Sequence, residues 1–163
     1  MNYTYRTTVY ASDIETVGNI VKSTGFFNEE EISVAKELVE EALLKGEDSG
    51  YEFIFTETDD RVIAYVCFGR IPCTKHSYDL YWIVTHKDFQ ALGIGKMLMN
   101  EFENQMKLRG AHGVYVETSS KNQYLPTRKF YEKMNYIEKA HFEHFYDRND
   151  GKVVYVKYIN PIA

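Results

Sequence analysis

A glycine-bearing turn is the segment of this sequence whose residue types and spacing best suit the binding of a charged ligand. It reads Gln90-Ala91-Leu92-Gly93-Ile94-Gly95-Lys96 and follows a strand-like run that ends at Ile83-Val84-Thr85. A helix-like run that ends near Arg109 comes next. Because the turn opens a helix, several main-chain N–H groups point towards one place, and the helix dipole adds positive potential there. The segment therefore predicts a binding site for a phosphate or pyrophosphate group.

Two common nucleotide-binding signatures do not fit this turn. A P-loop requires Gly five positions before Gly95 and Ser or Thr after the lysine, but the chain has Gln90 and Met97 there. A dinucleotide-binding fingerprint requires a small residue at Leu98 and a βαβ unit early in the chain, and the sequence has neither. A Gly-x-Gly turn can also join a strand to a helix without binding any ligand, so a second motif is needed to decide.

That second motif is the segment Phe130-Tyr131-Glu132-Lys133-Met134-Asn135-Tyr136. It is similar to the Phe-Tyr-Glu-Lys-x-Gly-Phe segment of the GNAT family of N-acetyltransferases. Asn135 stands in the place of the glycine, and asparagine tolerates the left-handed backbone that such a helix end requires. The turn that begins at Gln90 resembles the same family's acetyl-CoA signature, Gln/Arg-x-x-Gly-x-Gly/Ala after a strand. The resemblance spans roughly residues 5–159.

The resemblance implies acetyl-CoA as co-substrate and assigns residues to its parts. The turn from Gln90 to Lys96 would hold the pyrophosphate, and the main chain of Ile83, Val84 and Thr85 would pair with the pantetheine arm. Many relatives carry an Asn seven residues before the catalytic Tyr, a position that is Tyr124 here, whereas Asn122 lies two residues earlier. Either Asn122 or Tyr124 is therefore expected to contact the pantetheine arm.

The resemblance also implies which residues carry the reaction. In the family, the Tyr of Phe-Tyr lies near the thioester sulfur and can protonate the departing thiolate, which makes Tyr131 the general-acid candidate. An ammonium has no lone pair, so a carboxylate near the acceptor must remove a proton first. Several relatives place such a base near the end of the preceding strand, where Glu117 lies. Asp79 shares a strand face with Tyr81 by the period of two, and it is a second candidate to bind or deprotonate the amine.

The elements that must position these residues can be read along the chain. Strands are predicted over residues 5–10, 51–56, 62–68, 78–84, 114–118, 136–142 and 153–158. Helices are predicted after a Ser12–Glu15 capping box, after an Asn28 cap, and over residues 95–109 and 125–134. This order predicts an α+β protein with a mixed sheet. The GNAT fold implied by the resemblance is a central, mostly antiparallel sheet flanked by helices on both faces, formed here by a single domain over residues 1–163.

Composition limits the class of protein and its partners. The chain has 163 residues, 44% hydrophobic and 26% charged, as expected for a soluble globular protein. A net charge of −5 argues against nucleic acid as the partner. The sequence has no apolar run of about 18 residues that predicts a membrane span, and Cys67 and Cys73 do not form a Cys-x-x-Cys pair. We expect a cytoplasmic protein without a metal.

The sequence thus predicts an acetyl-CoA-dependent N-acetyltransferase that acts in a ternary complex. Its acceptor would be a small-molecule amine or a peptide amine. Two alternatives stay open: a protein or peptide N-terminal acetyltransferase, and a non-catalytic module that senses acyl-CoA. The strands expected near the C-terminus are compatible with a homodimer.

Overall fold

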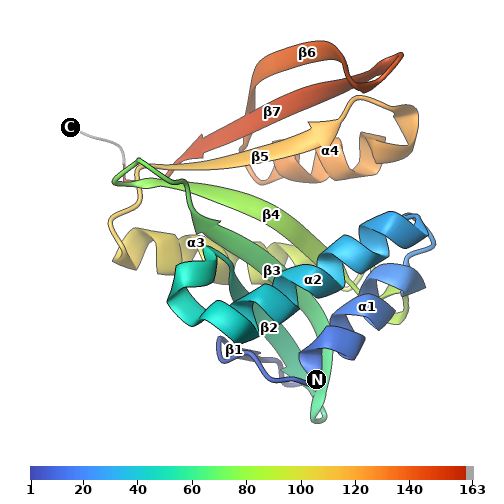
Figure 1. Cartoon of the computed structure of the whole chain (residues 1–163), viewed down its shortest axis with the longest axis vertical. Helices are drawn as coiled ribbons and strands as arrows, with labels where there is room; N and C mark the ends of the chain where they lie inside the picture. Colours follow the sequence, from blue (N-terminus) through green and yellow to red (C-terminus); the bar gives the residue numbers. More distant parts are fainter. Residues whose placement is uncertain (161–163) are drawn as a thin grey trace. The chain divides into compact units, whose positions relative to one another are not determined.

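The computed structural model describes residues 1–160 (Figure 1). The strands are β1 (Thr4–Arg6), β2 (Glu52–Thr58), β3 (Arg61–Arg70), β4 (Ser77–Thr85), β5 (Gly113–Ser119), β6 (Ile137–Asp147) and β7 (Asp150–Tyr158). The α-helices are α1 (Asp13–Ser23), α2 (Glu29–Lys45), α3 (Ile94–Leu108) and α4 (Leu125–Lys133). Residues 161–163 of the expected domain lie outside the described residues.

The strands pair in the order β1-β2-β3-β4-β5-β7-β6. β4 and β5 are parallel, whereas β1 with β2, β2 with β3, β5 with β7 and β6 with β7 are antiparallel. The predicted α+β class with a mixed, mostly antiparallel sheet is therefore confirmed. The chain forms two compact units: unit 1 comprises Met1–Gly69 and Trp82–Phe102, and unit 2 comprises Arg70–Tyr81 and the residues from Glu103 onwards.

In unit 1, helices cover both faces of the strands. α1 and α2 lie on one face (Figure 1), where Cys67 and its strand neighbours join a buried cluster with the apolar stripes of both helices. Its fully apolar members are Val17, Ile20, Val21, Ala35, Val39, Ala42, Phe53, Phe55 and Val84. Phe68 follows Cys67 and so points to the other face, where its ring lies 5.0 Å from that of Phe102 in α3. The alternation of side chains along β3 thus determines which residues pack against α1 and α2 and which pack against α3.

The two predicted helix starts have different outcomes. The Asn28 cap is confirmed, because its side chain accepts from the Glu31 N–H at 2.8 Å and Glu31 accepts in return from the Asn28 N–H. The Ser12–Glu15 capping box is wrong, since Ser12 makes no side-chain cap bond. The buried carboxylate of Asp13 instead accepts from the Tyr10 N–H at 2.7 Å and from both terminal nitrogens of Arg6 at 2.9 Å.

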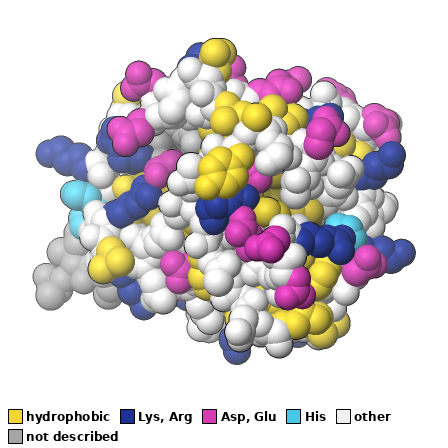
Figure 2. All heavy atoms as spheres, turned by 90° about the horizontal axis from the view of Figure 1, so that it is seen from below, with side chains coloured by type: hydrophobic (Ala, Val, Ile, Leu, Met, Phe, Trp, Pro, Cys, Tyr) yellow, Lys and Arg dark blue, Asp and Glu magenta, His cyan; other side chains and the backbone are white. Residues whose placement is uncertain are grey.

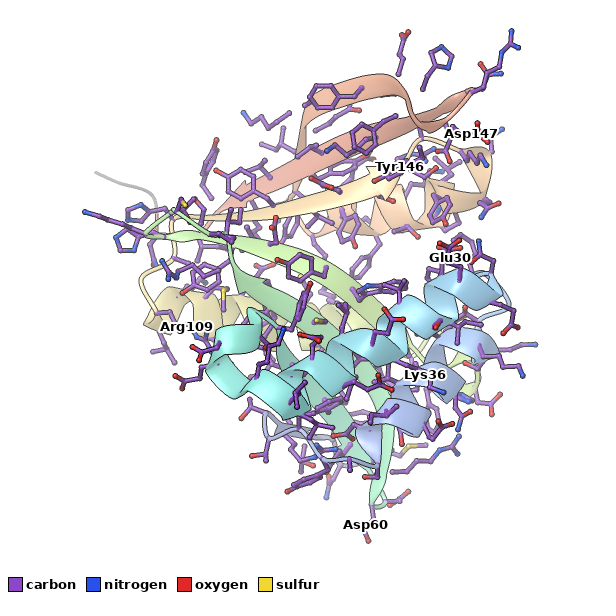
Figure 3. All side chains as sticks on the ribbon, viewed as in Figure 1. Glu30, Lys36, Asp60, Arg109, Tyr146 and Asp147 are labelled. Carbon is purple, nitrogen blue, oxygen red and sulfur yellow. The ribbon has the colours of Figure 1, made fainter. Side chains whose placement is uncertain are left out.

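In unit 2, β5 lies between β4 and β7, and α4 packs on one face. The ring of Tyr131 in α4 lies 6.0 Å from that of Tyr155 in β7, and the Tyr155 hydroxyl donates to Glu132 at 3.1 Å. β6 is the last strand in the order, and nearly all of its residues are exposed. Tyr146 and Asp147, labelled in Figure 3, lie near the turn that leads from β6 into β7.

β6 extends beyond the predicted strand over residues 136–142, because its pairing with β7 continues past a bulge. Phe142 pairs with Lys152 and Asp147 with Asp150, so the register shifts between these two pairs. His144, inside the bulge, has a φ of 56° and its ring Nδ1 accepts from the Asn149 N–H at 2.8 Å. A bulge re-aims neighbouring side chains, which matters for Phe145 below.

The surface shows no large area of one charge on the face drawn in Figure 2, where Lys, Arg, Asp and Glu side chains are intermixed. Among residues 1–160, no helix has both the length and the apolar character needed to cross a membrane.

Candidate active site

The turn predicted to bind pyrophosphate leads into α3 and belongs to unit 1. Ala91 and Gly93 both have positive φ, at 63° and 78°. Residues 90–93 are exposed, and α3 begins at Ile94. The N–H of Met97 donates to the Gly93 carbonyl at 3.0 Å, so the N–H groups of Ile94, Gly95 and Lys96 precede the first intrahelical donor. This is the backbone arrangement that an anion site at a helix start requires.

The segment between β4 and this turn is held by hydrogen bonds within unit 1. The Gln90 side-chain amide donates to the Thr85 carbonyl at 3.2 Å. The His86 N–H donates to the Ile63 carbonyl at 2.8 Å, and the Lys87 N–H donates to the Ser23 hydroxyl at 3.0 Å. Gln90 therefore links the turn to the strand end. The sequence motif did not predict this hydrogen bond.

The strand end Ile83–Thr85 was predicted to offer its main chain to the pantetheine arm. Val84 is buried in the unit 1 core, whereas Ile83 and Thr85 are half-buried. Because the Val84 side chain is already packed among apolar residues, only the main chain of this position remains for a ligand. The parallel pairing of β4 with β5 spans Ser77–Leu80 of β4, which comes before this strand end.

Unit 2 brings together the two carboxylates predicted as bases. Asp79 pairs with Tyr115 in the ladder, and Tyr115 and Glu117 alternate onto the same face. Burial raises the pKa of Asp79, the negative charge of Glu117 raises it further, and a hydrogen bond with Tyr81 opposes this rise. Glu117 has 53% of its side chain exposed, so solvent and an external amine can reach it.

Tyr131 lies on the opposite face of the same strands. Its ring packs against Tyr155, which pairs with Val116, the neighbour of Glu117 in β5. Because neighbouring residues point to opposite faces, the Tyr131 ring and the Glu117 carboxylate lie on opposite faces of β5, next to Val116, where the pairing of β5 with β4 ends. Tyr131 is only 5% exposed, and burial raises its pKa above the ordinary value of 10, which by itself keeps a phenol protonated at neutral pH. A protonated phenol is the form that a general acid requires.

The helix that carries Tyr131 is positioned at both ends. At its end, Asn135 has the left-handed backbone expected from the sequence, with a φ of 67°, and the Tyr136 N–H donates to the Tyr131 carbonyl at 2.9 Å. Before its start, Asn122 and Tyr124 form a 3-10 turn (Asn122–Tyr124). Arg128 of α4 donates to the carbonyls of Ser119 and Lys121, at 2.6 and 2.9 Å.

Sequence reasoning missed a cation on the carboxylate face. Lys152 in β7 places its Nζ 3.3 Å from Glu117 Oε1, and its positive charge opposes the rise in the pKa of Asp79. The ring of Phe145 lies 4.1 Å from the same ammonium. No local signal marks Lys152, because it meets Glu117 through strand pairing between residues 35 positions apart. Among residues 1–160, no group of three His, Cys, Asp or Glu side chains is arranged to hold a metal ion.

Comparison with known proteins identifies the family. Residues 19–136 match the model of the Acetyltransferase (GNAT) family. A solved structure from Desulfovibrio desulfuricans, described as an acetyltransferase of the GNAT family, is 37% identical and has a TM-score of 0.94. The similarity covers 97% of this chain and 99% of that one.

More distant solved structures share the fold. The ribosomal-protein-S18-alanine N-acetyltransferase from Escherichia coli is 16% identical, with a TM-score of 0.77 over 99% of this chain and 96% of that one. An aminoglycoside 6'-N-acetyltransferase complexed with coenzyme A is 15% identical, with a TM-score of 0.76 over 100% of this chain and 99% of that one. No protein of curated function matches the chain significantly. By its family match and by its close structural relative, this chain belongs to the GNAT family of acetyltransferases.

Proposed function

We propose that the protein is an acetyl-CoA-dependent N-acetyltransferase that transfers the acetyl group directly to a primary amine. The observation that carries the proposal is the division of unit 2 into two chemical faces. Carboxylates suited to accept a proton from an amine occupy one face, and a buried, protonated Tyr131 occupies the other. A direct transfer needs both groups, because the attacking amine must lose a proton and the leaving thiolate must gain one.

The turn Gln90–Lys96 supports the choice of co-substrate. Its free helix-start N–H groups suit the pyrophosphate of acetyl-CoA, and the side chain of Lys96 is exposed beside them. A relative of the same fold is solved in complex with coenzyme A. We assign the main chain of Ile83, Val84 and Thr85 to the pantetheine arm, together with Asn122 or Tyr124.

The proposed reaction proceeds through an amine that first loses its proton to Glu117 or Asp79. The raised pKa of Asp79 makes it a stronger base than an ordinary aspartate, whereas Glu117 is the more accessible of the two carboxylates. The neutral amine attacks the thioester carbonyl, which a main-chain N–H near Val84 polarises. The C–S bond then breaks and Tyr131 protonates the thiolate, while the nitrogen loses its second proton as the amide forms and this proton restores the Tyr131 phenol by way of water. Orientation of the two reactants and fixed hydrogen-bond donors supply most of the rate acceleration.

The acceptor is proposed as a small-molecule amine or a peptide amine, because a carboxylate face flanked by aromatic rings suits an alkylammonium group. Related structures are named for action on aminoglycosides and on a ribosomal-protein alanine, and these names apply to those proteins. At 15% and 16% identity they indicate the fold and leave the acceptor of this chain to experiment.

The test is release of the CoA thiol from acetyl-CoA across a panel of amines, combined with a calorimetric titration of CoA. The panel contains aminoglycosides, alkyl diamines, lysine derivatives and peptides with free N-termini. Turnover of small amines supports the proposal, and turnover of peptides alone supports an N-terminal acetyltransferase. Tight CoA binding with no turnover of any amine identifies a sensing module, and no CoA binding contradicts all three functions.

A further inference from the structure

The ion pair between Lys152 and Glu117 involves one of the two carboxylates proposed to deprotonate the acceptor amine. Lys152 Nζ lies 3.3 Å from Glu117 Oε1, the distance at which an amine can give its proton directly to a carboxylate. The two residues lie on one face of the sheet, because Lys152 pairs with Ser119 and Ser119 alternates with Glu117 onto that face. A primary amine of the protein itself therefore lies within hydrogen-bond distance of a proposed base.

Aromatic rings hold this amine in place. The Lys152 ammonium lies 4.1 Å from the centroid of the Phe145 ring and 5.6 Å from that of Phe142, both within the range of a cation–π interaction. Phe142 is the direct pairing partner of Lys152 in β6. Phe145 lies in the bulge with His144, and the bulge brings it to the same ammonium.

Exposure distinguishes this pair from an ordinary surface salt bridge. The side chain of Lys152 is 16% exposed, whereas that of Glu117 is 53% exposed. The lysine is thus enclosed by its neighbours while the carboxylate stays open to solvent, which can carry away a proton. Asp79 adds a second carboxylate on the same face, because it pairs with Tyr115 and Tyr115 alternates with Glu117.

We propose that Lys152 is an internal acceptor, and that the protein acetylates its own Lys152 when acetyl-CoA is bound and no external amine is present. This inference rests on the proposed N-acetyltransferase function. The Lys152 ammonium gives one proton to Glu117, which passes it to water. The free amine forms an N–C bond with the thioester carbonyl carbon, the C–S bond breaks, and the thiolate takes a proton from Tyr131. The nitrogen loses its second proton as the amide forms, and this proton restores the Tyr131 phenol by way of water. The products are N-acetyl-lysine at position 152, CoA and one released proton.

Acetylation changes the face on which it occurs. An acetylated lysine is neutral, so it loses both its ion pair with Glu117 and its cation–π attraction to Phe145. Glu117 is then free to receive the ammonium of an external acceptor. The internal reaction therefore happens once in each molecule and opens the carboxylate face for further turnover.

To test the inference, the purified protein is incubated with acetyl-CoA and no added amine. Acetylation of each lysine is then followed by peptide mass spectrometry. Lys133 in α4 is exposed and serves as an internal control for non-enzymatic acetylation. We expect Lys152, although more enclosed, to be acetylated at least about tenfold faster than Lys133, because it is held beside a base. The rate of Lys152 acetylation per molecule should not change when the protein is diluted about tenfold, because the reaction is intramolecular.

A matched variant separates chemistry from accessibility. Glu117→Gln keeps the side-chain shape, and it should bring Lys152 to the rate of Lys133 while leaving Lys133 unchanged. Thermal unfolding of the variant checks that it is folded. Acetylation of Lys152 no faster than of Lys133, or a rate that falls on dilution, overturns the inference. If amines are turned over while Lys152 stays unmodified, the inference fails and the proposed function stands. If neither reaction occurs, the proposed function fails as well.

Discussion

The turn Gln90–Lys96 offers a ligand main-chain N–H groups, whereas the face of Asp79, Glu117 and Lys152 offers side chains. The turn depends on backbone conformation at Ala91 and Gly93, which have φ values of 63° and 78°. The carboxylate face depends on pairing between β5 and β7, which brings Glu117 next to a lysine 35 residues away. A site formed by backbone conformation can be recognised in a short stretch of sequence. A site formed by side chains on paired strands cannot, because its residues are far apart in the chain.

Because the two sites differ in this way, we expect the removal of a single side-chain group to reduce activity most at Tyr131. Removal of its hydroxyl in Tyr131→Phe should lower kcat by roughly 100-fold to 1,000-fold, because proton transfer to the thiolate loses its donor. The affinity for CoA should change little. Steady-state kinetics with an amine found in the panel, together with a CoA titration, provide the measurement. A variant that keeps the parent kcat would show that Tyr131 only packs α4 against β7.

The second prediction tests whether backbone conformation carries CoA binding at the turn. A Cβ built on Gly93 has no atom within 4 Å, so Gly93→Val acts through the left-handed backbone and not through a clash. The cost of about 1–2 kcal/mol should weaken CoA binding by roughly tenfold.

The matched control is Ala91→Gly, which relieves the same kind of conformation two residues earlier. It should keep CoA affinity within about twofold of the parent. Calorimetric titration of CoA compares the two variants. Equal affinities would mean that the turn does not have to keep this backbone shape to bind its ligand.

A smaller effect is expected for a side chain of the same turn. Lys96 is exposed, so its attraction to a phosphate is screened by water and salt. Lys96→Met should weaken CoA binding by about threefold at low salt, and the difference should shrink at high salt. Titrations at two salt concentrations measure it. A loss larger than that of Gly93→Val would reverse the comparison and make the turn a side-chain site.

The smallest expected effect concerns the pH dependence of stability at Asp79. Its pKa is raised in the folded state by burial and by Glu117, so the folded protein binds this proton more tightly than the unfolded chain does. The charged carboxylate therefore costs stability above the raised pKa, and this cost disappears below the ordinary value of 3.8. Asp79→Asn should raise Tm at pH 7 by no more than about 2 °C. The gain should vanish as the pH falls towards 4, and an equal gain at both pH values would point to a cause other than charge.

The same contrast explains which parts of the fold could be predicted. Local sequence signals gave correct predictions where one residue type suits a particular backbone conformation or hydrogen bond. Examples are the Asn28 cap and Asn135, whose φ is 67°. The prediction failed at Ser12, where sequence spacing suggested a cap. Asp13 instead pairs with Arg6 of β1, seven residues earlier, and the four-residue capping-box pattern does not include that partner.

The candidate site shows the same limit. The family motifs led to the turn and to Tyr131 because each lies in one continuous segment. Glu117 and Asp79 were predicted as alternatives, and the structure places them on one face, because parallel pairing aligns Asp79 with Tyr115. Lys152 and Phe145 were missed, since strand register and a bulge bring them to Glu117. Register is set by the whole sheet and not by any short window of sequence.

The exposed strand β6 has a consequence for the behaviour of the protein at high concentration. It is the last strand in the order, so one edge of its main chain has no strand partner within residues 1–160, and Phe142 and Phe145 are each more than half exposed. Such an edge is a template for aggregation between chains. The charged side chains of Glu138, Lys139 and Glu143 interrupt this strand, as gatekeeper residues do, so we expect their replacement by apolar residues to promote aggregation.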